Sequence, residues 1–322
     1  MTQQFNRNIE IRIIGADDTL ILNRGLDIQF LCNKDRSSTP NELTINALNL
    51  SESSRKFIRA NGVIELYVGY GESLDLLARM DVQKIITRFD PPNTVSEITC
   101  ADGLKALRDT EIKLSFKGNA TVAQAVASIV AQMGITLRQV DIDLNIPMKS
   151  GYTHTGKATE ALDDVLSLVK GVWGVINNVL IITQRGKGIG TPVLKISPSN
   201  GLLGQPAVME DTFTYERMLH AKKDKKQAGK EPKTASVKFK RGESASVKTV
   251  SVDVERTEST QETVEGVEMD MLMRPNINPF DKIELESRFI NGTYVVDKVD
   301  HAGATRDGDF ISRVTAYREA AS

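Results

Sequence analysis

The sequence predicts an α+β fold that is mainly β, and three observations lead to this expectation. Short runs that alternate apolar and polar residues dominate both ends of the chain, as half-buried strands do. The middle of the chain instead shows the apolar spacing of amphipathic helices. A length of 322 residues suffices for two or three domains with buried cores. We therefore expect two antiparallel β domains, each a barrel or a sandwich, at 1–116 and 187–322, around a small α+β module at 117–186.

The composition is that of a globular protein and excludes several classes of function. The chain is 40% hydrophobic and 26% charged, with a formal net charge of −1 at pH 7. Such a balance gives the whole chain no electrostatic footprint for DNA or for anionic lipid. Aromatic residues make up only 5%, which disfavours a stacking surface for single-stranded nucleic acid. No run of 18 apolar residues occurs, so neither a membrane span nor a secretory signal is expected.

The first β domain is predicted from alternating runs separated by turn residues. The runs include Ile9–Ile13, Leu43–Ala47 and Ile64–Val68. Ser51 has the chemistry of a helix cap, so a short helix is expected up to Ile58. Two cysteines, Cys32 and Cys100, both lie in apolar strand-like runs, which predicts small buried thiols without a disulfide.

The middle module is predicted from two helix patterns and a hairpin. Thr121 can cap a first helix that ends at Gly134. Thr159 can cap a second helix that ends at Gly171. The dipeptide Asn177-Asn178 predicts the turn of a following hairpin.

The second β domain is predicted to follow a glycine-rich hinge at Arg185–Gly190. A phosphate-binding loop is not expected there, because its full spacing between a strand and a helix is missing. Alternating patterns resume downstream, at Pro192–Ile196, Val267–Met273, Ile283–Leu285, Tyr294–Val299 and Phe310–Tyr317.

A charged insertion, at about 213–265, is expected to interrupt this second domain. Its first part is basic and its second part is acidic, and apolar residues alternate in between, so an excursive hairpin with a basic start is one interpretation. The basic part is predicted to be either a solvated loop or an arm that docks a partner protein. The candidate docking residues are Lys222, Lys223, Lys225, Lys226, Lys230, Lys238, Lys240 and Arg241.

Nothing in the sequence indicates catalysis, a metal or a cofactor. The three histidines, His154, His220 and His301, lie in different regions without a partner motif. The cysteines and histidines lack the paired spacing of a zinc site. The adjacent carboxylates Asp163 and Asp164 point about 100° apart on a helix, so at least one is expected to be a solvated surface charge. His301 is expected to be a hydrogen-bonded structural histidine. We therefore expect no enzyme.

Several short segments resemble, in the same order, the baseplate hub proteins of contractile-tailed bacteriophages. The middle module contributes the helix Ala158–Val169 followed by Trp173-Gly174-Val175. The likeness spans nearly the whole chain except about 213–265. The other segments are Pro40-Asn41, Asn49-Leu50-Ser51, Gly69-Tyr70, Cys100-Ala101-Asp102-Gly103, Gly201-Leu202-Leu203-Gly204-Gln205-Pro206, Met271-Leu272-Met273-Arg274-Pro275-Asn276-Ile277-Asn278-Pro279, Asp281-Lys282-Ile283-Glu284-Leu285, Ile290-Asn291-Gly292-Thr293-Tyr294-Val295-Val296-Asp297-Lys298-Val299-Asp300-His301-Ala302-Gly303 and Gly308-Asp309-Phe310.

The resemblance implies two tail-tube-like antiparallel β-barrel domains in each chain. It also implies a homotrimeric hub in the virion tail baseplate, assembled in the host cytoplasm. The hub would join the sixfold tail tube protein to the threefold central spike protein and contact other baseplate components. Genomic DNA would pass through its lumen, without membrane insertion. The segment Leu77–Val82 departs from the family pattern, because it lacks an aromatic residue and a glycine. The alternatives are a tail-associated cell-wall hydrolase and another spike or tube-initiating component.

Overall fold

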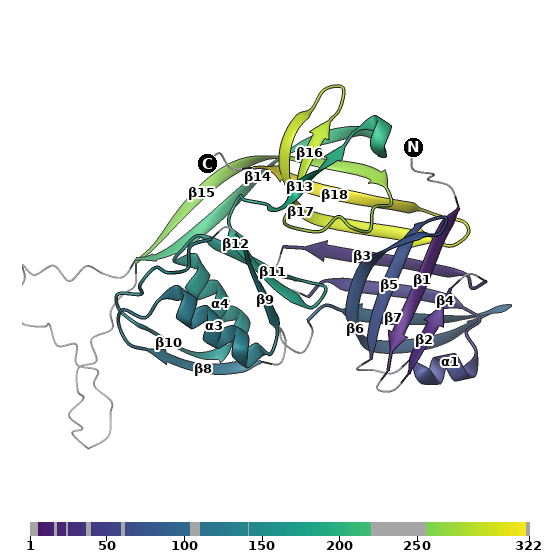
Figure 1. Cartoon of the computed structure of the whole chain (residues 1–322), viewed down its shortest axis with the longest axis horizontal. Helices are drawn as coiled ribbons and strands as arrows, with labels where there is room; N and C mark the ends of the chain where they lie inside the picture. Colours follow the sequence, from purple (N-terminus) through teal and green to yellow (C-terminus); the bar gives the residue numbers. More distant parts are fainter. Residues whose placement is uncertain are drawn as a thin grey trace, which may run out of the picture. The chain divides into compact units, whose positions relative to one another are not determined.

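The structure is a computed structural model, and it describes residues 6–15, 18–23, 25–36, 40–58, 62–103, 110–140, 142–219 and 256–319. The described chain forms two compact units, residues 1–212 with 263–322, and residues 213–262. In the second unit the described residues are the distal parts of two paired strands, 213–219 and 256–262. All described helices and the other described strands, which are labelled in Figure 1 where there is room, belong to the first unit.

A 13-stranded sheet is the main feature of the fold. We call its N-terminal part the first half-sheet and its C-terminal part the second half-sheet. The first contains β1 (Arg7–Ile14), β2 (Thr19–Leu22), β3 (Ile28–Asp35), β4 (Glu42–Leu48), β5 (Val63–Tyr70), β6 (Ser73–Asp90) and β7 (Asn93–Ala101). The second contains β13 (Ile189–Ile196), β14 (Leu202–Leu219), β15 (Arg256–Leu272), β16 (Asp281–Glu286), β17 (Asn291–Ala304) and β18 (Phe310–Arg318), with the short 3₁₀ helix η1 (Pro198–Asn200) after β13.

The mainly β, α+β fold class is confirmed, and no closed barrel is found among the described strands. The strands of the two half-sheets form one open sheet, with β14 and β2 at the ends of its main path in the described part of the chain. The two half-sheets are continuous because β3 of the first pairs with β17 of the second. The outer edge of β3 therefore pairs with the second half-sheet and does not close the first half-sheet on itself.

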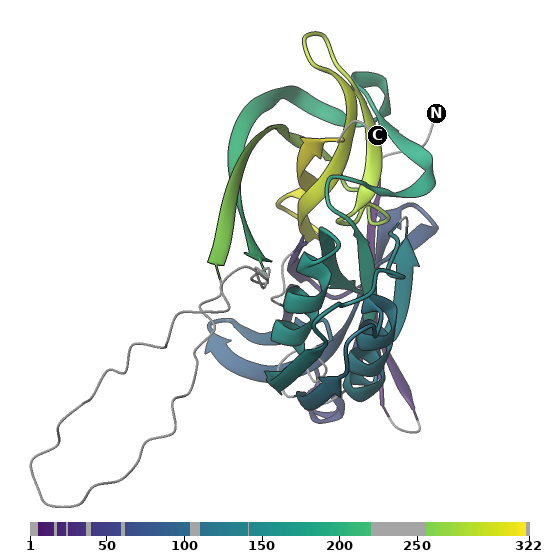
Figure 2. The same ribbon diagram turned by 90° about the vertical axis from the view of Figure 1, so that its left-hand side faces the viewer.

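The middle module packs two helices, α3 (Val122–Met133) and α4 (Ala158–Ser167), against two small sheets. The helices lie side by side in both views (Figures 1 and 2), and α4 contacts strands of both sheets. One sheet pairs β8 (Glu111–Phe116) with β10 (Tyr152–Lys157). The other joins β9 (Thr136–Val140), β11 (Gly171–Ile176) and β12 (Val179–Gln184). The apolar faces of the helices are buried together, as their spacing predicts.

Most predicted helix ends and turns are confirmed. Ser51 caps α1 (Glu52–Phe57) by accepting a hydrogen bond from Ser54 N. Thr121 forms a capping box with Gln124, and Gly134 ends α3 in the left-handed conformation. Asn177 and Asn178 both adopt positive φ, 54° and 62°, as a two-residue hairpin turn requires.

One local prediction is wrong. Thr159 does not cap α4, because the helix follows β10 directly and begins at Ala158, whose N–H donates to Thr110 O. The predicted hinge at 185–190 contains a turn at 185–186 and the first residues of β13, where Ile189 N–H donates to Phe280 O. Its role as a hinge stays a prediction. A Cβ atom on Gly188 would lie 2.4 Å from Lys282 Cγ, so this connection is packed against the second half-sheet.

Three main apolar cores underlie the sheet and the module. The first lies in the first half-sheet, the second in the middle module and the third in the second half-sheet. Met273 and Phe310 extend from the second half-sheet into the first core. The domain boundaries given above stay a prediction.

Both cysteines are buried free thiols, as predicted. Cys32 and Cys100 pair with the same residue, Leu43, from opposite sides, so two strand spacings separate them. That separation is roughly 10 Å, which exceeds the reach of a disulfide.

Burial raises the pKa of Cys32 and of Cys100 to about 12. We expect neither thiol of the folded protein to react with a thiol-specific chromogenic disulfide at pH 8, and both to react in denaturant. Rapid titration of even one thiol in the native protein would contradict the burial described here.

Candidate functional site

The predicted docking residues cannot be placed, because all eight lie outside the described residues. They are Lys222, Lys223, Lys225, Lys226, Lys230, Lys238, Lys240 and Arg241. His220 lies outside them as well.

The carboxylate pair in the middle module forms structural contacts. Asp163 accepts a hydrogen bond from Trp173 Nε1 at 2.7 Å. Asp164 accepts one from the Tyr152 hydroxyl at 3.2 Å, with His154 Nδ1 3.7 Å away. The two carboxylates thus bind different partners and do not converge on a common point. Among the described residues, no three His, Cys, Asp or Glu side chains gather closely enough to hold a metal ion.

The two half-sheets repeat the same strand order. It is β3-β4-β7-β6-β5-β1 in the first and β14-β15-β18-β17-β16-β13 in the second. The counterparts also follow one another in the same order along the chain. The match is incomplete, since β2 has no counterpart, and β13 runs parallel to β16 where β1 runs antiparallel to β5. One chain therefore carries two similar sheet units.

The repeat extends to individual residues in the long strands β6 and β17. The register of β6 against β7 is irregular between Val82 and Lys84, and that of β17 against β18 is irregular between Val296 and Lys298. Beyond these irregularities, the pair Thr87–Ser96 corresponds to the pair His301–Ser312. In both pairs a polar side chain faces a fully buried serine, at 3.4 Å and 2.8 Å. This equivalence pairs each residue of β17 with one of β6.

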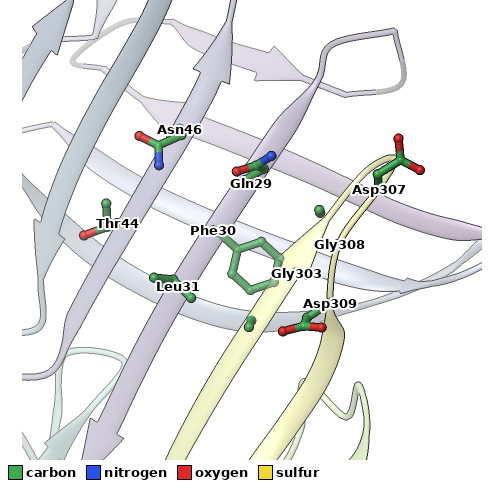
Figure 3. A pocket seen from close by; sticks show the side chains of 11 residues that line it. Gln29, Phe30, Leu31, Thr44, Asn46, Gly303, Asp307, Gly308 and Asp309 are labelled. Carbon is green, nitrogen blue, oxygen red and sulfur yellow. The ribbon is translucent and has the colours of Figure 1, made fainter.

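We call the pairing of β3 with β17 the seam. It joins residues 29–35 to residues 298–304 in antiparallel register. Phe30 lies opposite Gly303, and a Cβ atom on Gly303 would come within 2.4 Å of the Phe30 ring (Figure 3). The glycine is needed there because the aromatic ring occupies the space above it.

A cluster of buried polar side chains lies at one end of the seam, where the middle module meets both half-sheets. We call Lys34, Asn41, Asp102, Asn278 and Asp281 the polar junction. Lys34 donates from Nζ to Asn278 Oδ1 at 2.7 Å and to Leu77 O. Asn41 donates from Nδ2 to Val175 O at 2.6 Å, in the middle module. The junction thus ties the three regions together.

Asp102 holds the hairpin turn of the middle module against the first half-sheet. Its carboxylate accepts hydrogen bonds from the backbone N–H groups of Asn177 and Asn178, at 2.7 and 2.5 Å. The side chains of the same two residues bind back, Asn178 Oδ1 accepting from Gly103 N and Asn177 Oδ1 from Arg79 N. Asn177 and Asn178, whose positive φ angles form the turn, therefore also attach that turn to the first half-sheet.

Burial perturbs the ionisation of the charged members of the junction. It raises the pKa of Asp102 and of Asp281 to about 6 each, opposed by backbone hydrogen bonds and by Lys34. Burial also lowers the pKa of Lys34, opposed by Cys32, Asp102 and Asp281. Each carboxyl group therefore holds its proton to a higher pH in the folded protein than in the unfolded chain, where its ordinary pKa is 3.8.

The free energy of unfolding is accordingly expected to carry a contribution that falls as the pH rises from about 4 to about 6. In that window the folded chain binds more protons than the unfolded chain, so raising the pH favours unfolding. The variant Asp281→Asn keeps an acceptor for Asn278 N. Denaturant titrations at four pH values should give it a smaller loss of stability across the window than the wild type. Equal losses would contradict this assignment.

His301 is a buried, hydrogen-bonded residue, as predicted. Its Nδ1 lies 2.8 Å from Ser312 Oγ, and burial lowers its pKa well below the ordinary value of 6.5. Ser312 in turn accepts from Arg274 N. The histidine is therefore neutral and part of the packing beside the seam.

The exposed face of the seam is hollowed, and both apolar and polar residues line the hollow. A depression of about 240 Å³ lies over β3, β4, β17 and the loop before β18 (Figure 3). Leu31, whose exposed fraction is 59%, forms its floor beside Thr44 and Asn46, and Asp307 and Asp309 lie at one side. No nucleophile and base meet in this part of the described structure, so the depression suggests no reaction.

Sequence reasoning missed both the seam and the junction. A signal for the repeat was present in the tripeptide Ile-Glu-Leu, which occurs at 64–66 and again at 283–285 at matching positions of β5 and β16. A signal for the junction was the alternation Ile28, Phe30, Cys32, Lys34, which places a lysine on the buried face of β3.

Comparisons with known proteins place the fold among tail proteins. No protein-family model matches the chain, and no curated protein matches it. The 43 kDa tail protein of prophage MuSo2 from Shewanella oneidensis has a similar structure, with a TM-score of 0.61 and 11% identity over 97% of this chain and 98% of that one. A tail protein from Neisseria meningitidis MC58 has a TM-score of 0.61 and 9% identity, over 98% and 97% of the two chains.

A third similar structure comes from a secretion machine. The Escherichia coli c3393 protein, a type VI secretion component described as similar to the phage T4 tail proteins gp27 and gp5, has a TM-score of 0.53 and 12% identity, over 96% of this chain and 77% of that one. At such identities the likeness establishes the fold. This chain has the fold of phage tail proteins, which agrees with the resemblance found in its sequence.

Proposed function

We propose that this protein is a structural component of a phage tail or of a related injection machine, specifically a homotrimeric baseplate hub. The observation that carries the proposal is the repeat of one strand order in two half-sheets of a single chain. Three such chains present six similar sheet units with threefold symmetry. A ring of this kind can meet a sixfold tail tube on one face and a threefold central spike on the other.

The exposed charges of the second half-sheet support a role as a DNA conduit. Arg313 forms a two-pronged ion pair with Asp270, and Lys298 pairs with Asp300 at 2.7 Å. Arginine and lysine side chains that are already neutralised by carboxylates bind passing phosphates weakly. A lumen lined by such a surface lets DNA pass without being trapped.

The charged segment at 213–265 is proposed to contact another baseplate component through its basic residues. Deletion of residues 214–264 should leave the hub able to assemble but reduce the yield of infectious tails. Full infectivity of the deletion variant would contradict this role.

The hub proposal is tested by mixing the purified protein with the tail tube protein of the same particle and imaging the product by electron microscopy. We expect a threefold ring with six similar lobes capping the tube. A complex in which each ring holds one lobe per chain would favour a tube-initiating component instead. A cell-wall hydrolase is the alternative from another class, and release of soluble peptidoglycan fragments by the purified protein would favour it.

No helix among the described residues is both long and apolar enough to cross a membrane. The proposed location is the tail baseplate of the virion, with assembly in the host cytoplasm.

A further inference from the structure

The long strands β6 and β17 are counterparts, yet only β17 is paired along its full length. The first part of β17, residues 291–295, pairs with β16, and its second part, residues 298–304, pairs with β3 on the same side. The first part of β6, residues 73–81, likewise pairs with β5. Its second part, residues 84–90, pairs only with β7 within the described structure. One edge of β6 is therefore open where β17 receives β3.

The strand that corresponds to β3 is also unpaired on its outer side. β14 stands at the end of the strand order, next to β15 alone in the described part of the chain. The hydrogen bond Leu272 N to Gly201 O begins its pairing with β15, as the bond Leu48 N to Asp27 O begins the pairing of β3 with β4. Gly201 thus corresponds to Asp27. The described chain thus has an open β6 edge, which corresponds to the β17 side of the seam, and an open β14 edge, which corresponds to the β3 side.

We propose that the open edge of β6 in one copy of this chain pairs with the open edge of β14 in a second copy, in the arrangement of the seam. This inference rests on the proposed function, because it gives the contact that would close the trimer. An open edge offers a row of unpaired N–H and C=O groups, which a complementary strand satisfies. The seam shows that these two types of strand fit each other.

Exposed apolar side chains gather on the same two edges. Phe89 near the end of β6 is 75% exposed, and Val208 and Leu203 on β14 are 58% and 37% exposed. Val208 corresponds to Lys34, which is 1% exposed because the seam and the polar junction cover it. This difference in exposed fraction between Val208 and Lys34 is expected if Val208 is covered only after assembly.

The register of the seam brings an aromatic residue and a glycine together again, with their roles exchanged. Inside the chain, Phe30 of β3 covers Gly303 of β17. Their counterparts are Gly204 of β14 and Phe89 of β6. Gly204 differs from Gly303 in having a positive φ of 66°, and a Cβ atom on it would meet nothing within 4 Å in the single chain, so the space beside it is open. The exposed Phe89 of one copy thereby gains a site on the next.

The proposed ladder has one hydrogen bond fewer than the seam. Pro206 corresponds to Cys32 and has no N–H to donate. A proline in an edge strand discourages pairing with unrelated strands. The contact then depends on the aromatic–glycine pair, which selects another copy of this chain.

Each copy offers one β6 edge and one β14 edge, so the contact joins copies head to tail. Such a heterologous contact gives a ring when the rotation between copies closes. With three copies, the alternation of seam and intermolecular contact would connect all six half-sheets.

Paired cysteines test the register directly. Arg88 and Gln205 are the counterparts of Ala302 and Leu31, which face each other across the seam. The double variant Arg88→Cys, Gln205→Cys should form covalent dimers and trimers on mild oxidation, while the native cysteines stay buried. As a matched control, Arg88→Cys with Leu168→Cys places the second thiol at an exposed position of the middle module, where no cross-link is expected. Absence of cross-linked species in the first variant would overturn the proposal.

The variant Phe89→Asp gives a second readout. Because Phe89 is exposed in the single chain, we expect unchanged thermal unfolding of the monomer and at least about tenfold weaker association. If the wild-type protein forms trimers that resist Phe89→Asp and do not cross-link at 88 and 205, the edge contact is wrong and the hub proposal survives. If the wild-type protein forms no trimer, alone or with the tube protein, both fail.

Discussion

Replacing Lys34 with methionine is expected to lower the free energy of unfolding by about 3–5 kcal/mol, the usual cost of removing one partner from a buried charged group. Lys34 is fully enclosed and supplies the donors that reach Leu77 O and Asn278 Oδ1. Methionine fills a similar volume without a donor, so the acceptors stay buried and unsatisfied.

The same substitution should also change the pH dependence of stability. Lys34 is the cation that lowers the pKa of Asp102 and of Asp281 against the effect of burial. Without it both carboxyl groups become harder to ionise, so the loss of stability should extend to higher pH than in the wild type.

Lys113→Met is the matched control, because Lys113 lies on β8 with its side chain exposed and outside the proposed contact between copies. We expect it to change stability by less than about 0.5 kcal/mol. Denaturant titration of both variants checks the prediction. A similar small effect for Lys34→Met would contradict the description of the polar junction.

Replacing Gly303 with alanine is expected to destabilise the protein by about 1–3 kcal/mol, the range for overpacking a filled core. The new methyl group would fall within 2.4 Å of the Phe30 ring, which is itself buried and has no room to move freely.

A double-mutant cycle isolates the cause of this effect. Phe30→Leu should cost stability alone by leaving a void, yet it should cost less in the presence of Gly303→Ala, because the shorter side chain relieves the clash. Additive effects, measured by denaturant titration of the three variants, would show that Phe30 and Gly303 are not packed against each other.

Local patterns predicted the elements of this fold well. The capping residues Ser51 and Thr121 and the Asn177-Asn178 turn are determined by near neighbours, and all three are confirmed. Thr159 failed as a cap because β10 leads straight into α4. Where a strand leads directly into a helix, the strand determines the first helical residue, whatever the capping preference of a nearby threonine.

The joining of the half-sheets was beyond the reach of local patterns. The seam pairs residues about 270 positions apart, and neither strand shows by its own alternation which neighbour it takes. The same applies to the polar junction, since the roles of Asp102 and Asn178 arise only once β7 meets the middle module. The family resemblance implied two similar domains, and comparison of the chain with itself, through Ile-Glu-Leu at 64–66 and 283–285, would have indicated the repeat from the residues alone.

The central claim, that this chain is one third of a closed ring, is tested most directly by the mass of the purified protein in solution. Light scattering across a range of concentrations, alone and with the tail tube protein, measures it without labels. We expect a species of about three times the 35.4 kDa chain. A monomer at every concentration that also forms no complex with the tube protein would contradict it.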